Sequence, residues 1–216
     1  MSVDVKICGL RDPASVAAAV ENGAKFIGFV FCEKSRHRVE ADLVARLIEN
    51  VPVSVATVGL FVNPTNEELK AVLSKVPLTM LQLHGMETPE RVASIKAMTK
   101  RGVVKSIGIA SAEDVIRAYP YEAVADYLLV DAKPPPNRPR GVNGRTFDWE
   151  LLENVEFTKP WLLAGGLNLE NIEKAVAMTG APILDVSSGV EDENGNKSPA
   201  KIKAFLDKAR TIETCC

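Results

Sequence analysis

The chain has 216 residues, and its 26 lysines and arginines against 28 aspartates and glutamates give a formal net charge of −2. Hydrophobic residues make up 46% and charged residues 25%, which is typical of a globular domain and excludes disordered, collagen-like and coiled-coil chains. We expect one domain over residues 1–216. The near-neutral charge, without a basic stripe, argues against nucleic acid or an anionic membrane as a partner.

The four cysteines are too few and too unevenly spaced for a disulfide framework, at positions 8, 32, 215 and 216. No pair has CxxC spacing, which argues against a zinc site or a thioredoxin-type redox site. No apolar run approaches the roughly 20 residues of a membrane-spanning helix, and the first residues lack the pattern of a signal peptide. We therefore expect a cytoplasmic protein with reduced thiols.

Short apolar runs, rich in β-branched and aromatic residues, recur along the chain at the length of buried strands. In chain order they span 3–8, 26–31, 55–61, 79–83, 103–109, 125–131, 161–164 and 182–186. The segments between most of these runs have the composition of amphipathic helices. The sequence therefore predicts an alternation of strands and helices.

Helix-start signals support this alternation. In chain order they are Asp12–Pro13, Asn63–Pro64–Thr65, Thr88–Pro89, Asn168 and Ser198–Pro199. Gly23 and Gly180 follow the helices that start at Asp12 and Asn168, in the position of a C-terminal cap.

Regular alternation implies a parallel sheet, and eight units favour a single closed (β/α)8 TIM barrel. The alternative is an open, flavodoxin-like or Rossmann-like sheet, although no GxGxxG motif follows the first strand. The one irregular stretch, KPPPNRPRGVNG at 133–144, is too long for an ordinary turn and predicts a mobile loop or lid after the sixth strand.

Polar side chains end four of the predicted strands. In a barrel the chemistry lies at the carboxyl ends of the strands, and alternation along each strand selects the inward-facing residues. By this test Cys8, Gln82, His84, Asp131, Asp185 and Ser187 point inward near the top, with Lys6 on the same face as Cys8. Each alone is more often a packing or capping residue, but their convergence at one mouth favours a functional site.

Two glycine-rich segments follow the seventh and eighth strands, AGGL at 164–167 and DVSSGVE at 185–191. Loops at these positions commonly bind phosphate in barrels, because glycines and helix N-termini expose backbone amides. The candidate phosphate ligands are Gly165, Gly166, Ser187, Ser188 and Gly189. Tight turns without a ligand are the alternative reading.

Taken together, the motifs resemble those of the phosphoribosylanthranilate isomerases of tryptophan biosynthesis. In the family's order they are KICGL (6–10), GFVF (28–31), KS (34–35), VGLFVN (58–63), LQLHG (81–85), LLVD (128–131), GRTFDW (144–149), AGGL and DVSSGVE. The resemblance covers nearly the whole chain. It implies an Amadori rearrangement of an aminoaldose to an aminoketose, without metal or cofactor.

The resemblance also implies residue roles. Cys8, from KICG, would be the general base, and Asp131, which closes the sixth strand, the general acid. Asp185, Gln82 and His84 would position the ribose hydroxyls or the reacting centre. We expect Lys6 to lower the pKa of the Cys8 thiol, and burial or the substrate's negative charges to keep a proton on Asp131.

Two segments depart from the family pattern. The family has SPR after the second strand, with its Arg near the anthranilate carboxylate, whereas this chain has Ser35-Arg36-His37-Arg38. By spacing, His37 takes the position of the family's Arg. The contact with the anthranilate carboxylate could therefore come from Arg36, His37 or Arg38. After the sixth strand, GVNGRTFDW stands where the family has GGSGKTFDW.

Two other readings stay open at this stage. One is another sugar-phosphate barrel enzyme, although a metal-dependent epimerase needs more histidine ligands than His37 and His84. The other is a non-catalytic sugar-phosphate-binding barrel. In each case the expected partner is a small molecule, and the chain is expected to be a monomer or a homodimer.

Overall fold

The computed structural model describes residues 3–132, 149–153 and 155–212. Within them, eight parallel strands form one closed barrel in chain order, and the last strand pairs with the first. The strands are β1 (Asp4–Cys8), β2 (Phe26–Val30), β3 (Ala56–Phe61), β4 (Met80–Leu83), β5 (Gly102–Ile109), β6 (Tyr127–Ala132), β7 (Trp161–Ala164) and β8 (Ile183–Val186). The predicted (β/α)8 barrel is confirmed, and the open-sheet alternative is wrong.

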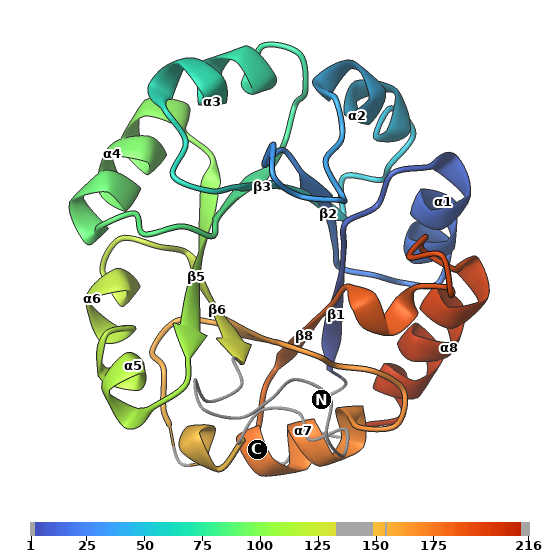
Figure 1. Cartoon of the computed structure of the whole chain (residues 1–216), viewed down its shortest axis with the longest axis vertical. Coiled ribbons are helices and arrows are strands. Elements are labelled where there is room, and N and C mark those ends of the chain that lie inside the picture. The colour runs from blue at the N-terminus through green and yellow to red at the C-terminus, as the bar shows by residue number, and fades with distance from the viewer. Residues whose placement is uncertain (1–2, 133–148, 154, 213–216) are drawn as a thin grey trace.

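Helices surround the ring of strands (Figure 1). They are α1 (Pro13–Glu21), α2 (Ala41–Leu47), α3 (Asn66–Leu73), α4 (Pro89–Thr99), α5 (Ala112–Ile116), α6 (Tyr119–Glu122), α7 (Ile172–Thr179) and α8 (Pro199–Arg210), with the short 3-10 helices η1 (Trp149–Leu152) and η2 (Ser188–Val190). No helix among the described residues is long and apolar enough to cross a membrane. The predicted loop or lid at 133–144 lies outside the described residues.

Side-chain caps explain where four of the eight described α-helices begin. Thr65 accepts a hydrogen bond from the Glu68 amide at 3.1 Å, and the Glu68 carboxylate accepts one from the Thr65 amide at 2.7 Å. This reciprocal pair satisfies two amides that the first turn leaves free. Asp12, Thr88 and Ser198 likewise cap α1, α4 and α8, as predicted.

The predicted start of α7 is wrong. The helix begins at Ile172, and its N-cap is Asn171 rather than Asn168. The Asn171 side chain accepts a hydrogen bond from the Asn168 amide at 2.8 Å, and Asn168 accepts one from the Glu170 amide at 2.9 Å. Two asparagines three positions apart both have capping chemistry, and the first of them forms a turn before the helix. Gly180 ends α7 in the left-handed conformation, as predicted.

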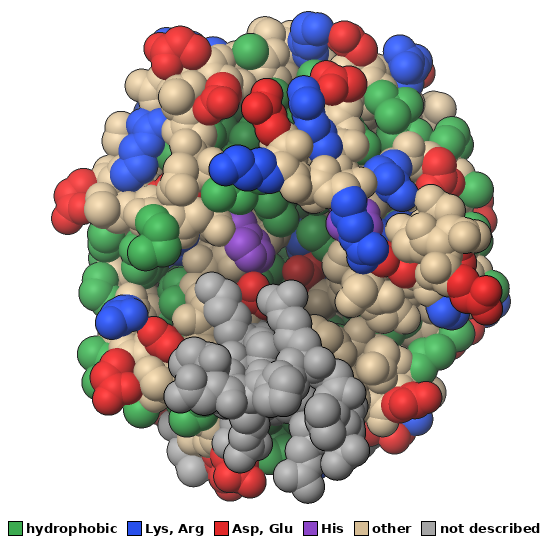
Figure 2. Space-filling model, in the orientation of Figure 1, with side chains coloured by type: hydrophobic (Ala, Val, Ile, Leu, Met, Phe, Trp, Pro, Cys, Tyr) green, Lys and Arg blue, Asp and Glu red, His purple; other side chains and the backbone are tan. Residues whose placement is uncertain are grey.

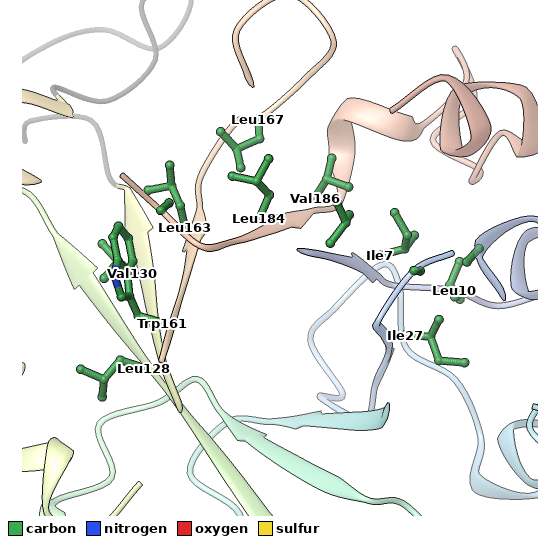
Figure 3. Packing of buried hydrophobic residues seen from close by; sticks show 14 of the residues in the cluster. Ile7, Leu10, Ile27, Leu128, Val130, Trp161, Leu163, Leu167, Leu184 and Val186 are labelled. Carbon is green, nitrogen blue, oxygen red and sulfur yellow. The ribbon is translucent and has the colours of Figure 1, made fainter. Parts of the chain in front are cut away.

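Side chains alternate between two hydrophobic layers, as the strand parity predicts. One layer fills the inside of the barrel and consists of Phe26, Val58, Met80, Val104, Leu129, Leu162, Ala164 and Ile183. The other lies between strands and helices and includes Ile7, Ile27, Leu128, Val130, Leu163, Leu184 and Val186 (Figure 3). Because these apolar residues fill much of the barrel, the polar inward residues that gather at one place are those at the carboxyl ends of the strands.

Candidate active site

A cavity of about 380 Å³ opens at the carboxyl ends of the strands. Figure 2 shows the corresponding hollow near the centre of this face, with histidine side chains close to it. The predicted site residues that line it are Cys8, His37, Gln82, His84, Asp131, Gly165, Gly166, Asp185, Ser187 and Ser188. Arg36 and Gly189 do not line it.

One wall of the cavity is apolar and was not predicted from the sequence. Val30 at the end of β2, with Leu60 and Val62 at the end of β3, lines the cavity beside Cys32 and Ser35. Val30 and Leu60 follow the same parity as the barrel-filling Phe26 and Val58. That periodicity could have identified this wall. Such a surface suits a flat or apolar part of a ligand.

A buried ion pair lies beside the cysteine. Lys6 has no exposed side-chain surface, and its Nζ donates a hydrogen bond to Asp185 Oδ1 at 2.8 Å. The strand register produces this contact, because Lys6 on β1 pairs with Asp185 on β8. Burial alone lowers the pKa of Lys6, but the negative charges of Asp185 and Cys8 outweigh it and raise that pKa above its ordinary value. Lys6 therefore remains an ammonium ion.

The Cys8 thiol is subject to opposing effects. Burial raises its pKa, the charge of Lys6 lowers it, and the carboxylate of Asp185 raises it again. The net pKa is above the ordinary value, so the net lowering that we expected from Lys6 is not found, although Lys6 acts in the expected direction. Gly28 on β2 leaves room for this group, because a Cβ there would lie 3.1 Å from Cys8 Sγ and 3.2 Å from Lys6 Nζ.

A row of polar side chains in contact lies across the barrel from Cys8. Gln82 Nε2 lies 3.0 Å from His84 Nδ1, and His84 Nε2 lies 3.4 Å from Asp131 Oδ2. Ser106 Oγ approaches the same ring nitrogen at 3.5 Å. Gln82 is buried, whereas His84 and Asp131 are 33% and 26% exposed at the cavity. The end of β4 is thus coupled to the end of β6.

The segment after β2 is held by Glu191, which follows β8. The Glu191 carboxylate contacts Arg36 Nη2 at 2.7 Å, Lys197 Nζ at 2.7 Å and His37 Nε2 at 3.3 Å. Arg36 is 65% exposed and lies outside the cavity lining because this contact holds it. Arg38 instead pairs with Glu40 at 3.0 Å.

His37 is the member of this basic segment that lines the cavity. Burial and the nearby charge of Lys197 lower the pKa of His37, so the ring is neutral near pH 7. Arg36 Nε donates to His37 Nε2 at 3.1 Å, which places the ring proton on Nδ1. Nδ1 is buried and has no hydrogen-bond partner within the described part of the chain.

The two glycine-rich loops differ in what their glycines do. Gly165 and Gly166 line the cavity with φ values of +96° and +69°, a conformation that favours glycine. Gly189 instead packs against the neighbouring loop, since a Cβ there would overlap the carbonyl oxygen of Leu167. Its contact with phosphate stays a prediction.

We expect Gly189→Ala to lower the free energy of unfolding by about 3 kcal/mol, at the upper end for overpacked sites, because backbone has to move. Urea unfolding would measure the loss. Glu170→Ala, an exposed change in the same pair of loops, is the control and should leave the unfolding midpoint unchanged. An unchanged midpoint for Gly189→Ala would contradict the close packing of the two loops.

Comparison with known proteins identifies the family to which this arrangement belongs. The sequence profile of the N-(5'-phosphoribosyl)anthranilate (PRA) isomerases matches residues 5–208. The chain belongs to this family. It is 51% identical to the N-(5'-phosphoribosyl)anthranilate isomerase of Paracoccus denitrificans, covering 97% of this chain and 98% of that one. It is 49% identical to that of Rhodospirillum centenum, covering 98% and 100%.

Solved structures of phosphoribosylanthranilate isomerases share the fold over nearly the full length. The enzyme from Thermotoga maritima superposes with a TM-score of 0.85 at 35% identity, covering 97% of this chain and 100% of that one. A second isomerase structure, in complex with reduced 1-(o-carboxyphenylamino)-1-deoxyribulose 5-phosphate, has a TM-score of 0.81 at 33% identity with the same coverage. The Thermotoga maritima isomerase is described as dimeric in a further structure.

Proposed function

We propose that the chain is an N-(5'-phosphoribosyl)anthranilate isomerase, an aldose–ketose isomerase of tryptophan biosynthesis. The observation that carries the proposal is the cavity itself, in which Cys8 on β1 and Asp131 on β6 share one space with the glycine-rich loops after β7 and β8. Family membership and the small-molecule complex of a structural relative support the same reaction.

In the proposed mechanism, Asp131 is the general acid and Cys8 the general base. Asp131 gives its proton to the furanose ring oxygen, the ring opens, and the nitrogen lone pair forms the Schiff base. Cys8, as thiolate, then removes the proton from C2, and the resulting enol amine tautomerises to the ketone. The buried ammonium of Lys6 stabilises the thiolate against the cost of burial.

Opposite ends of the cavity suit the two ends of the substrate. Gly165, Gly166, Ser187 and Ser188 offer backbone amides and hydroxyls to the phosphate, with φ values at the glycines that open the backbone to a ligand. The anthranilate ring fits the wall formed by Val30, Leu60 and Val62. Asp185 lines the same cavity, and we assign it to the ribose hydroxyls.

Of the three basic residues after β2, we assign the anthranilate carboxylate to His37. It lines the cavity, whereas Arg36 is held outside by Glu191 and Arg38 pairs with Glu40. A neutral histidine offers one hydrogen bond in place of the two-pronged contact of an arginine.

Removing the His37 side chain should raise KM about tenfold with a smaller change in kcat, which corresponds to one lost hydrogen bond. Arg36→Ala and Arg38→Ala are the matched controls and should each change KM less than about threefold. Steady-state kinetics measures all three variants. A tenfold rise for Arg36→Ala, with none for His37→Ala, would show that Arg36 turns into the cavity and makes the contact.

The experiment that tests the function is a fluorescence assay with freshly prepared phosphoribosylanthranilate. Rapid loss of anthranilate-type fluorescence on adding the purified protein is expected. Two other functions, a non-catalytic sugar-phosphate-binding barrel and another sugar-phosphate isomerase, predict no loss with this substrate. A calorimetric titration with the reduced product analogue separates the two, because only the binding barrel should take it up.

A further inference from the structure

Gln82 has an unusual environment for a residue so close to a cavity. It is 1% exposed, its Nε2 lies 3.0 Å from His84 Nδ1, and its Oε1 is buried without a partner among the described residues. An amide nitrogen only donates hydrogen bonds. His84 Nδ1 is therefore the acceptor, and the ring proton lies on Nε2.

A proton on His84 Nε2 is compatible with only one protonation state of Asp131. His84 Nε2 lies 3.4 Å from Asp131 Oδ2 and 3.5 Å from Ser106 Oγ, and a donor at this position suits a carboxylate that has already lost its proton. A general acid must also exist in the protonated state. In that state the carboxyl group itself donates, and His84 Nε2 has to accept.

Turning the Gln82 amide over produces the matching arrangement for the protonated acid. Oε1 then accepts from His84 Nδ1–H, and His84 Nε2 is free to accept from the Asp131 hydroxyl. In both orientations one atom of the amide is bonded to the ring and the other is unpaired. The two arrangements therefore have the same number of hydrogen bonds, so that the buried amide favours neither strongly.

We propose that Gln82 and His84 are positioning residues that alternate between these two arrangements as Asp131 gives up and regains its proton. The inference rests on the proposed role of Asp131 as the acid. When one arrangement changes into the other, one of the two His84 ring nitrogens, Nδ1 or Nε2, gains a proton and the other loses one. The number of protons on the ring does not change. Solvent exchanges both protons, since His84 is 33% exposed at the cavity.

Nitrogen-15 NMR of the full chain, labelled at histidine, reads the tautomer directly. The sequence contains two histidines, so that two ring systems are observed, and His37→Gln assigns them. The wild type should show His84 protonated at Nε2. Gln82→Glu, as a carboxylate, can only accept and should move the proton to Nδ1, while Gln82→Met should leave a mixture of both tautomers. The His37 signals should not move in either variant.

Kinetics distinguishes this role from a purely structural one. Both Gln82 variants should lower kcat about tenfold, the equivalent of one hydrogen bond in the transition state, with KM within about twofold. Gln82→Met, which is uncharged, keeps the test valid if Gln82→Glu does not fold. Tyr127→Phe, on the same inward face of β6 but lower in the barrel, is the control and should leave kcat unchanged.

Either of two results would overturn the inference. One is the same His84 tautomer in the wild type and in both Gln82 variants. The other is a rise in KM at constant kcat, which would make Gln82 a substrate ligand. Failure of the proposed function looks different, because an inert wild type would still give the tautomer pattern in the NMR spectra.

Discussion

Replacing Cys8 by alanine should lower kcat about 10²- to 10⁴-fold, the usual contribution of general acid–base catalysis by one group. The reason is geometric and chemical. The Cys8 thiol lies at the cavity beside the buried ammonium of Lys6, whose charge favours the thiolate that the proposed mechanism requires. Fluorescence decay of phosphoribosylanthranilate in single-turnover experiments measures the rate.

Cys8→Ser is the sharper variant. It keeps the size of the side chain and its position opposite Gly28, but a hydroxyl is a far weaker acid than a thiol and forms almost no anion near pH 7. We expect it to be nearly as slow as Cys8→Ala. Binding of the reduced product analogue should persist in both variants. A serine variant with wild-type kcat would rule out the thiolate as the base.

Asp131→Asn gives the complementary result. Asparagine retains a polar atom near His84 Nε2 but carries no transferable proton, so kcat should again fall about 10²- to 10⁴-fold. Combining the change with Cys8→Ala should cost much less than the product of the two single losses, because acid and base serve one reaction. A fully multiplicative loss would argue that the two groups act independently.

The arrangement of strands could be predicted because it follows from simple periodicities. Parity along β1, β4, β6 and β8 placed Cys8, Gln82, Asp131 and Asp185 on the inside, and the barrel then brought them to one mouth. No long-range information was needed, since every strand of a (β/α)8 barrel ends on the same side. The residue roles stay predictions, because position alone does not measure chemistry.

Contacts between distant loops could not be predicted in the same way. Arg36 has the side chain to bind a carboxylate, yet Glu191, 155 positions later, holds it at the surface. The structural use of Gly189 also depends on a loop that no local pattern connects to it, the one containing Leu167. The pKa of Cys8 likewise required burial to be known, since burial outweighs the effect of Lys6.

The Lys6–Asp185 pair should produce the largest change in stability. Removing one member of a buried ion pair leaves the other charge in the interior, which costs about 3–5 kcal/mol of unfolding free energy. Lys6→Met and Asp185→Leu should each show a loss of this size in urea unfolding, because the side chains are 0% and 9% exposed. The double variant should recover about 2–3 kcal/mol relative to the sum of the single losses.

The exposed pair Lys203–Asp207 on α8 provides the matched control. It has the same charges at 2.6 Å, but both side chains are largely in solvent, and the same double-variant cycle should show no measurable coupling. If the buried pair also showed none, Lys6 and Asp185 would not interact in the folded chain as the geometry indicates.

In the double variant, the second substitution should offset part of the loss in stability but should not restore the pH dependence of kcat/KM. Without Lys6, the pKa of Cys8 rises, because the cation lowers it more than Asp185 raises it. Less thiolate is then present near pH 7, and the acid side of the kcat/KM profile moves to higher pH. The double variant is thus expected to be about 2–3 kcal/mol more stable than the sum of the two single losses predicts, while the displaced pH profile remains. A double variant that kept both the wild-type stability and the original pH profile would show that Lys6 contributes to neither. A partly recovered stability with a displaced pH profile would instead show that the buried charge of Lys6 serves catalysis.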